Sequence, residues 1–196
     1  MENQASTIPY QIYFESNPNP NSLKFVTNSM LLPAGDYYDF PNMESASNSE
    51  LAQQLFTFPY VQGVFFMSNF VTVTKNDETD WEEVKDGLKQ HIKEYLESGK
   101  TLVKERIQPV ATPSESDSDV VKNIKGVLDE YIKPAVESDG GAIAFESFDA
   151  NAGVVKVVLQ GSCSGCPSST ITLKSGIENL LKRMVPEVEY VEAING

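Results

Sequence analysis

Apolar and polar positions alternate along the first half of the chain in a pattern that indicates strands. Residues 10–16 and 23–28 predict two strands joined by a turn rich in Asn and Pro. Residues 61–75 predict two more, with a polar break near Ser68 between them. The stretch 28–47 has no pattern that assigns it to a helix or a strand.

Helical periodicity appears twice in the same half. Residues 47–59 offer a serine cap, Leu51 and Leu55 on one face, and a proline stop. Residues 80–98 begin at Asp80, a favourable N-cap, and place acidic residues in the first turn. The apolar stripe expected to be buried on this second helix consists of Val84, Leu88, Ile92, Tyr95 and Leu96.

The second half predicts the order α-β-β-α-β. A helix begins at Ser118 or Asp119 and is ended or kinked by Pro134. Its inward positions are Val120, Ile124, Val127, Leu128, Tyr131 and Ile132. Residues 142–148 and 154–160 then indicate a strand pair, preceded by a Gly-Gly turn whose glycines allow positive φ.

A second helix of this half begins near Pro167 and stops at Pro186, before a last strand at 187–191. Its inward positions are Leu173, Ile177, Leu180, Leu181 and Met184. The whole chain is therefore expected to be an α+β protein of two small mixed domains, the second a sheet with both helices on one face.

Composition changes most clearly at residues 107–119, where two prolines and several serines and acids replace apolar periodicity. This composition is typical of a flexible linker, which would let the flanking units reorient freely. We therefore predict a first domain at 1–106, a linker at 107–119 and a second domain at 120–196.

The formal net charge of −13 argues against binding to nucleic acid or to an anionic membrane surface, because both are negatively charged. No apolar run approaches the ~20 residues of a membrane span, and the N-terminal residues lack the pattern of a secretory signal or a transit peptide. We therefore expect a cytoplasmic protein. We find no nucleophile–base pair, phosphate loop or carboxylate constellation, which disfavours an enzyme.

Cys163 and Cys166 are the chain's two cysteines, and they lie in the uncharged segment GSCSGCPSST between a predicted strand and a predicted helix. A helix N-terminus favours the thiolate form, and Ser162 and the neighbouring hydroxyls can donate hydrogen bonds to sulfur. The polar, glycine-rich surroundings disfavour a pair that merely fills a core.

Three functional interpretations of this pair remain. A dithiol–disulfide oxidoreductase also places Cys-x-x-Cys at a helix start, although α-β-β-α-β is not the βαβ context expected of such proteins. A zinc site needs four ligands, and His91, the remaining nitrogen donor, is expected to be a solvated helix residue. An iron–sulfur cluster usually takes four cysteine thiolates.

Both metal sites need two thiols more than one chain provides, and a second copy related by a two-fold axis is the simplest source. A cluster bridging two subunits would be exposed and easily released. This arrangement suits a carrier, although the spacing alone does not separate iron–sulfur from zinc.

Residues 120 to about 194 resemble the NifU C-terminal (Nfu-type) domain, an iron–sulfur scaffold and carrier. The matching segments are KPAVESDGGAI, VVKVVLQGSCSGCPSS and TLKSGIENLLKRMVPEV. Residues 9 to about 98 resemble the Nfu N-terminal domain, with NPNPNSLKF, GVFFMSNFVTVTK and Trp81 in the expected order.

The resemblance implies that Cys163 and Cys166 ligate a cluster, typically [4Fe-4S], shared between the two subunits of a homodimer and delivered to apo-proteins. The first domain has no cysteine, so its expected work is docking to clients or to assembly machinery. For Asp139-Gly140-Gly141 we favour a turn that needs flexible glycine over a direct role. NPNPN and SLKF are likewise interpreted as a turn and a strand.

Overall fold

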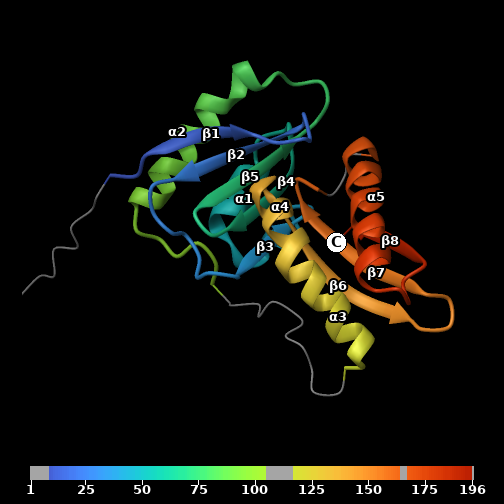
Figure 1. Cartoon of the computed structure of the whole chain (residues 1–196). Helices are drawn as coiled ribbons and strands as arrows, with labels where there is room; N and C mark the ends of the chain where they lie inside the picture. Colours follow the sequence, from blue (N-terminus) through green and yellow to red (C-terminus); the bar gives the residue numbers. More distant parts are fainter. Residues whose placement is uncertain (1–8, 105–116, 164–166, 196) are drawn as a thin grey trace, which may run out of the picture.

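The computed structural model describes residues 9–104, 117–163 and 167–195, which form two sheets, each with its own helices and hydrophobic core (Figure 1). This arrangement confirms the predicted α+β class with two mixed domains. The first domain contains β1 (Ile12–Ser16), β2 (Ser22–Thr27), β3 (Tyr37–Phe40), the 3-10 helix η1 (Ser45–Asn48), α1 (Glu50–Phe56), β4 (Val61–Met67), β5 (Phe70–Lys75) and α2 (Trp81–Glu97).

The first sheet is antiparallel, with the strand order β1-β2-β5-β4-β3. Its edge strand β3 comes from the stretch that the sequence pattern left unassigned. Both predicted helix starts are confirmed by side-chain caps. The Ser49 hydroxyl accepts a hydrogen bond from the Ala52 N–H at 3.2 Å, and the Asp80 carboxylate accepts one from the Glu82 N–H at 2.9 Å.

Both faces of this sheet are covered. Alternate strand residues such as Phe25 and Val71 belong to the core shared with α1 and α2. Residues of the opposite face, such as Val26 and Phe70, pack with Ala142 of the second domain. All six residues of β2 are consequently buried, which a strand with one solvated face would not show.

The second domain begins with one long helical segment. It consists of α3 (Asp119–Val127), the π-helical turn η2 (Leu128–Ile132) and α4 (Lys133–Ser138), capped by the Ser118 hydroxyl. Pro134 does not end the helix, which continues to Ser138, but the helix is interrupted by a π-helical turn just before this proline. Its missing N–H is accommodated next to the wide turn, where Lys133 N–H bonds the Leu128 carbonyl.

The π turn also explains a wrong inward position. Tyr131 was expected to face the core, yet it is 49% exposed. The extra residue in this turn breaks the 3.6-residue spacing on which the expectation rested, while Ile132 remains buried.

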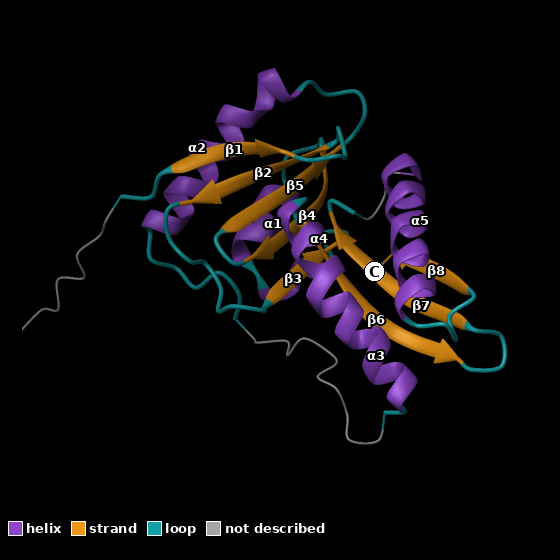
Figure 2. Cartoon of the chain, viewed as in Figure 1, coloured by secondary structure: helices purple, strands orange, loops and turns teal. Residues whose placement is uncertain are grey.

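The second sheet has the order β6-β7-β8 and is built from β6 (Gly141–Asp149), β7 (Val154–Gly161) and β8 (Tyr190–Asn195). β6 and β7 pair antiparallel, while β8 pairs parallel to β7 after the crossover helix α5 (Pro167–Met184). Residues of α3 and α5 share one core with alternate residues of β7, so both helices pack on the same sheet face (Figure 2).

Two details at the C-terminal end differ from the sequence pattern. Met184, expected to face inward, is 46% exposed, and Val185 takes the buried position beyond the helix end. The last strand starts at Tyr190 instead of Glu187, because Val188 N–H and Val185 carbonyl form a turn first.

Candidate functional site

Cys163 lies two residues beyond the Gly161 end of β7, and α5 begins at Pro167. The predicted position of this cysteine between a strand and a helix start is therefore confirmed. Cys166 lies outside the described residues, as do 164 and 165.

The Cys163 thiol is turned into the core of the second domain. The residue is 6% exposed and belongs to that core. Gly141 forms one wall of its pocket, since a Cβ built there would lie 2.9 Å from the sulfur. The Ser162 hydroxyl lies 3.9 Å from the same sulfur.

Burial dominates the electrostatics of this thiol. Desolvation raises the pKa of Cys163 to about 11, helped by the negative charge of Asp139 and opposed by the Ser162 hydroxyl. The thiolate expected from the helix start is therefore not the form that this conformation favours. To bind a metal, Cys163 must leave the pocket and lose its proton.

The turn at 139–141 packs against Gly161 and Ser162 of the cysteine segment, the stretch 161–170 that contains both cysteines, and we call this turn the base of the segment. Ser162 donates hydrogen bonds from its hydroxyl to the Asp139 carbonyl and from its N–H, at 3.3 Å, to the Gly140 carbonyl. Gly140 and Gly161 have φ values of 81° and 65°, in the left-handed region that favours glycine. The turn interpretation of the Gly-Gly motif is therefore confirmed.

Side chains of the first domain reach this same base. Asn19 Nδ2 donates a hydrogen bond of 3.1 Å to the Ser162 carbonyl. Thr72 Oγ1 donates one of 3.0 Å to the Gly140 carbonyl. Both side-chain donors are buried, so the two hydrogen bonds are shielded from water.

Lys24 crosses between the domains as well. Its ammonium donates a hydrogen bond of 2.9 Å to the Ser138 carbonyl, at the C-terminus of α4, and forms an ion pair of 2.9 Å with Glu15. Asn19 and Lys24 belong to the NPNPN and SLKF segments, whose sequence pattern predicts only a turn and a strand. A buried lysine and a buried asparagine are unusual, but their burial cannot be recognised in a single sequence.

Asp39 of β3 is the fourth contact. Its Oδ1 accepts a hydrogen bond of 3.3 Å from the Gly161 N–H, while Oδ2 is buried and has no hydrogen-bond partner among the residues that the structure describes. Burial raises the pKa of Asp39 to about 6, and the Gly161 and Phe40 N–H groups oppose this rise. The side chain therefore carries a partly destabilised charge at neutral pH.

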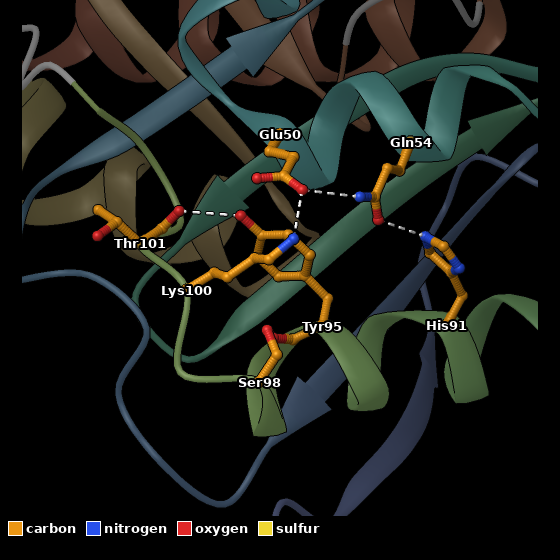
Figure 3. A network of polar contacts seen from close by, with 7 residues as sticks. All are labelled: Glu50, Gln54, His91, Tyr95, Ser98, Lys100 and Thr101. Carbon is orange, nitrogen blue, oxygen red and sulfur yellow. Dashed lines mark hydrogen bonds and ion pairs between the residues drawn. The ribbon is translucent and has the colours of Figure 1, made fainter.

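His91 is half-buried, so the expectation of a solvated helix residue is wrong. Its Nε2 lies 3.0 Å from Gln54 Oε1, and the Gln54 amide donates a hydrogen bond of 3.1 Å to Glu50 (Figure 3). Glu50 in turn pairs with Lys100. This network joins α1 to α2, on the sheet face opposite to Thr72, and it lies away from the cysteine segment.

Within the described ranges, no group of three or more His, Cys, Asp or Glu side chains is placed to hold a metal ion. Nor is any helix of the described residues long and apolar enough to cross a membrane.

Two family descriptions match the sequence in tandem. "Scaffold protein Nfu/NifU N terminal" matches residues 12–99, and "NifU-like domain" matches residues 124–192. The human "NFU1 iron-sulfur cluster scaffold homolog, mitochondrial" is 44% identical over 184 residues, which cover 93% of this chain and 71% of that protein. The chain belongs to the Nfu/NifU-like family.

A plant relative is as similar to this chain as the human protein is. "NifU-like protein 4, mitochondrial" of Arabidopsis thaliana is 44% identical over 92% of this chain and 65% of its own length. A solution NMR structure of a NifU-like protein from Saccharomyces cerevisiae covers 54% of this chain and 94% of its own, at 21% identity and a TM-score of 0.47. The chain thus spans about two thirds of the length of its curated relatives.

The expectation of a cytoplasmic protein is contradicted by these relatives. The Arabidopsis, human and Drosophila erecta family members are all named mitochondrial. The expectation rested on the absence of a transit pattern in the residues at hand, and targeting segments are removable additions that leave no trace in a folded domain.

Proposed function

We propose that this chain is a non-enzymatic iron–sulfur cluster scaffold and carrier. The observation that carries the proposal is the match of 93% of the chain to a human relative named an iron–sulfur cluster scaffold. The names of its relatives also favour a mitochondrial location.

Cys163 and Cys166 are the proposed ligands, because they are the chain's two cysteines. Iron–sulfur clusters take four thiolates as a rule, so two copies of the chain would each contribute a pair. The proposed cargo is a [4Fe-4S] cluster bridging a homodimer. A cluster held between two chains is exposed at their junction, which suits its transfer to apo-proteins.

The proposed division of labour follows the domain prediction. Residues 120–196 would carry the cluster, and residues 1–106 would dock the clients or assembly machinery from which clusters arrive and to which they pass. Residues 105–116, most of the predicted linker, lie outside the described residues.

The oxidoreductase alternative has less support than the scaffold, because the human relative that matches 93% of this chain is named an iron–sulfur cluster scaffold. The strand order does not exclude an oxidoreductase, since β7, α5 and β8 are a βαβ unit with parallel strands. Burial raises the pKa of Cys163 to about 11, and this opposes the thiolate that a redox dithiol and a cluster ligand both need. The zinc alternative gains no ligand from His91, which hydrogen-bonds Gln54.

Anaerobic reconstitution with ferrous iron and sulfide tests the proposal. We expect brown protein with about two irons and two sulfides per chain, a [4Fe-4S] Mössbauer spectrum and a native mass of two chains plus one cluster. Bound zinc without acid-labile sulfide, or a fully loaded monomer, would contradict the shared cluster.

A further inference from the structure

The sheet of the first domain presents a second, partly apolar face to the base of the cysteine segment. Val26, Phe65, Met67 and Phe70 form a buried cluster with Ala142, the second residue of β6. Ala142 is 3% exposed and lies in neither of the two domain cores. We call Val26, Phe65, Met67 and Phe70 the docked face. Their contact with Ala142 is an apolar contact between the two domains, separate from the core of either one.

Polar contacts surround this cluster and reach both walls of the Cys163 pocket. On one wall, Thr72 holds the Gly140 carbonyl, next to the Gly141 that touches the sulfur. On the other wall, Asn19 holds the carbonyl of Ser162, the residue before the cysteine.

The close approach of the two domains depends on glycine at the same positions. A Cβ on Gly140 would lie 2.8 Å from Thr72 Oγ1 and from Lys24 Cγ, and one on Gly161 would lie 2.9 Å from the Phe65 ring. The Gly-Gly turn and the glycine before the cysteines thus let the first domain reach the pocket backbone, besides shaping the turn.

Lys24 adds a charge that fits this docked position. Its ammonium donates to the last carbonyl of α4, where the partial negative charge of a helix C-terminus favours a cation. It also lies 4.5 Å from the centre of the Phe70 ring, inside the docked face.

We propose that the first domain is an internal docking partner of the cysteine segment: Asn19, Lys24 and Thr72 are positioning residues that hold Cys163 inside its pocket. Release of this face would remove the Asn19 and Thr72 hydrogen bonds from the Ser162 and Gly140 carbonyls and so let the thiol turn outward more easily. The occupant of the face is the second domain of the same chain.

The consequence for loading rests on the proposed function. A thiol that ligates a cluster shared by two chains cannot also fill the pocket against Gly141. If docking holds the thiol in this pocket, docking opposes cluster binding, and by linkage each weakens the other. Undocked variants should therefore take up iron and sulfide faster than the wild type.

The proposal is tested by measuring the accessibility of the Cys163 thiol in the full-length apo chain. In a Cys166→Ser background, Cys163 is the single thiol, and its labelling by iodoacetamide follows the fraction of open molecules. Ala142→Glu places a carboxylate inside the apolar contact between the domains. Ser147→Glu adds the same charge at an exposed position of the same strand and is the matched control.

We expect Ala142→Glu to label at least about tenfold faster than the wild-type background, with a larger radius of gyration, and Ser147→Glu to change neither. Thr72→Val removes one interdomain hydrogen bond and should speed labelling about fivefold. Thr74→Val, two positions along the same strand, is its control and should leave the rate unchanged.

Unchanged Cys163 labelling in an Ala142→Glu protein that scattering shows to be extended would overturn the proposal, because the second domain alone would then bury the thiol. An Ala142→Glu protein that stays compact would overturn the docked face itself. Neither outcome involves iron, so failure of wild-type protein to bind a cluster would count against the proposed function and leave the docking result standing.

Discussion

Asn19 and Ser162 are 143 positions apart, yet the Asn19 amide donates a hydrogen bond of 3.1 Å to the Ser162 carbonyl. The residue before the first cysteine is therefore held by the domain that has no cysteine. Because the donor is buried, loss of this contact would leave the Ser162 carbonyl without that partner. Gly161 and Ser162, the residues just before Cys163, are thus both hydrogen-bonded to the first domain in this conformation.

Cys166→Ser is expected to abolish retention of the cluster and cluster-dependent dimerisation, because one chain would then supply a single thiolate. Iron and sulfide analysis with native mass spectrometry would measure both losses. Circular dichroism should show unchanged helix and strand content. Ser175→Ala, an exposed change on α5, should bind like wild type. A Cys166→Ser protein with its full complement of iron and sulfide would refute the ligand assignment.

Two glycine substitutions should have opposite effects on the free energy of unfolding. Gly141→Ala would place a Cβ 2.5 Å from the Gln160 carbonyl oxygen and should destabilise the protein by about 1–3 kcal/mol. Gly126→Ala, in α3 where the new Cβ would enter open space, should stabilise it by about 0.5–1 kcal/mol. Urea denaturation measures both. Equal effects would mean that the close approach at Gly141 is relieved by movement of its neighbours.

Lys24→Met should cost about 1.5–3 kcal/mol, since it removes a buried charged donor from the Ser138 carbonyl and leaves Glu15 unpaired. Lys85→Met breaks the ion pair with exposed Glu82 and should cost no more than about 1 kcal/mol. The comparison uses the urea midpoints of the two variants. A Lys24→Met cost as small as that of Lys85→Met would show that the interdomain contact contributes little.

Asp39 predicts a pH dependence of stability. Its folded-state pKa of about 6 lies above the ordinary value of 3.8, so its stabilising contribution is complete below pH 3.8 and is lost as the pH rises through about 6. Unfolding free energy should therefore gain about 1.4 kcal/mol from this residue between pH 7.5 and pH 5.

Asp39→Asn should lose this increment, because the amide does not titrate. The groups around the carboxylate include the Gly161 and Phe40 N–H donors and the Tyr37 phenol. Burial raises the pKa of Tyr37 above its ordinary value of 10.0, so the phenol does not titrate between pH 5 and 7.5. Burial also raises the pKa of Asp139 and Glu137, so the difference between wild type and Asp39→Asn isolates the Asp39 share. If the unfolding free energies of the two proteins changed with pH in the same way, the pH dependence would not come from Asp39.

Local signals in the sequence predicted most of the elements. Ser49, Asp80 and Ser118 cap helices as expected, because an N-cap depends on residues within one turn of it. The position of Cys163 between β7 and α5 was likewise predictable from the strand pattern before it and the proline after it.

Other features needed information that no local pattern carries. Tyr131 faces outward because a π turn shifts the helix register, and His91 is half-buried because α1 supplies Gln54 beside it. β3 is an edge strand that, among the described strands, pairs with β4 alone. It therefore forms without the strong alternation of apolar and polar residues that would have predicted it.

By itself, the sequence determined the α+β class, the family and the cysteine pair at a strand-to-helix junction. Periodicity, caps and motifs depend on residues that are close in the sequence, so they can be predicted from the sequence alone. The tertiary structure decided that Cys163 is buried and that Asn19, Lys24 and Thr72 reach its pocket from the other domain. Desolvation and interdomain hydrogen bonds depend on which surfaces come into contact. Contacts between residues more than 60 positions apart, such as Thr72 and Gly140, are determined only by the folded structure.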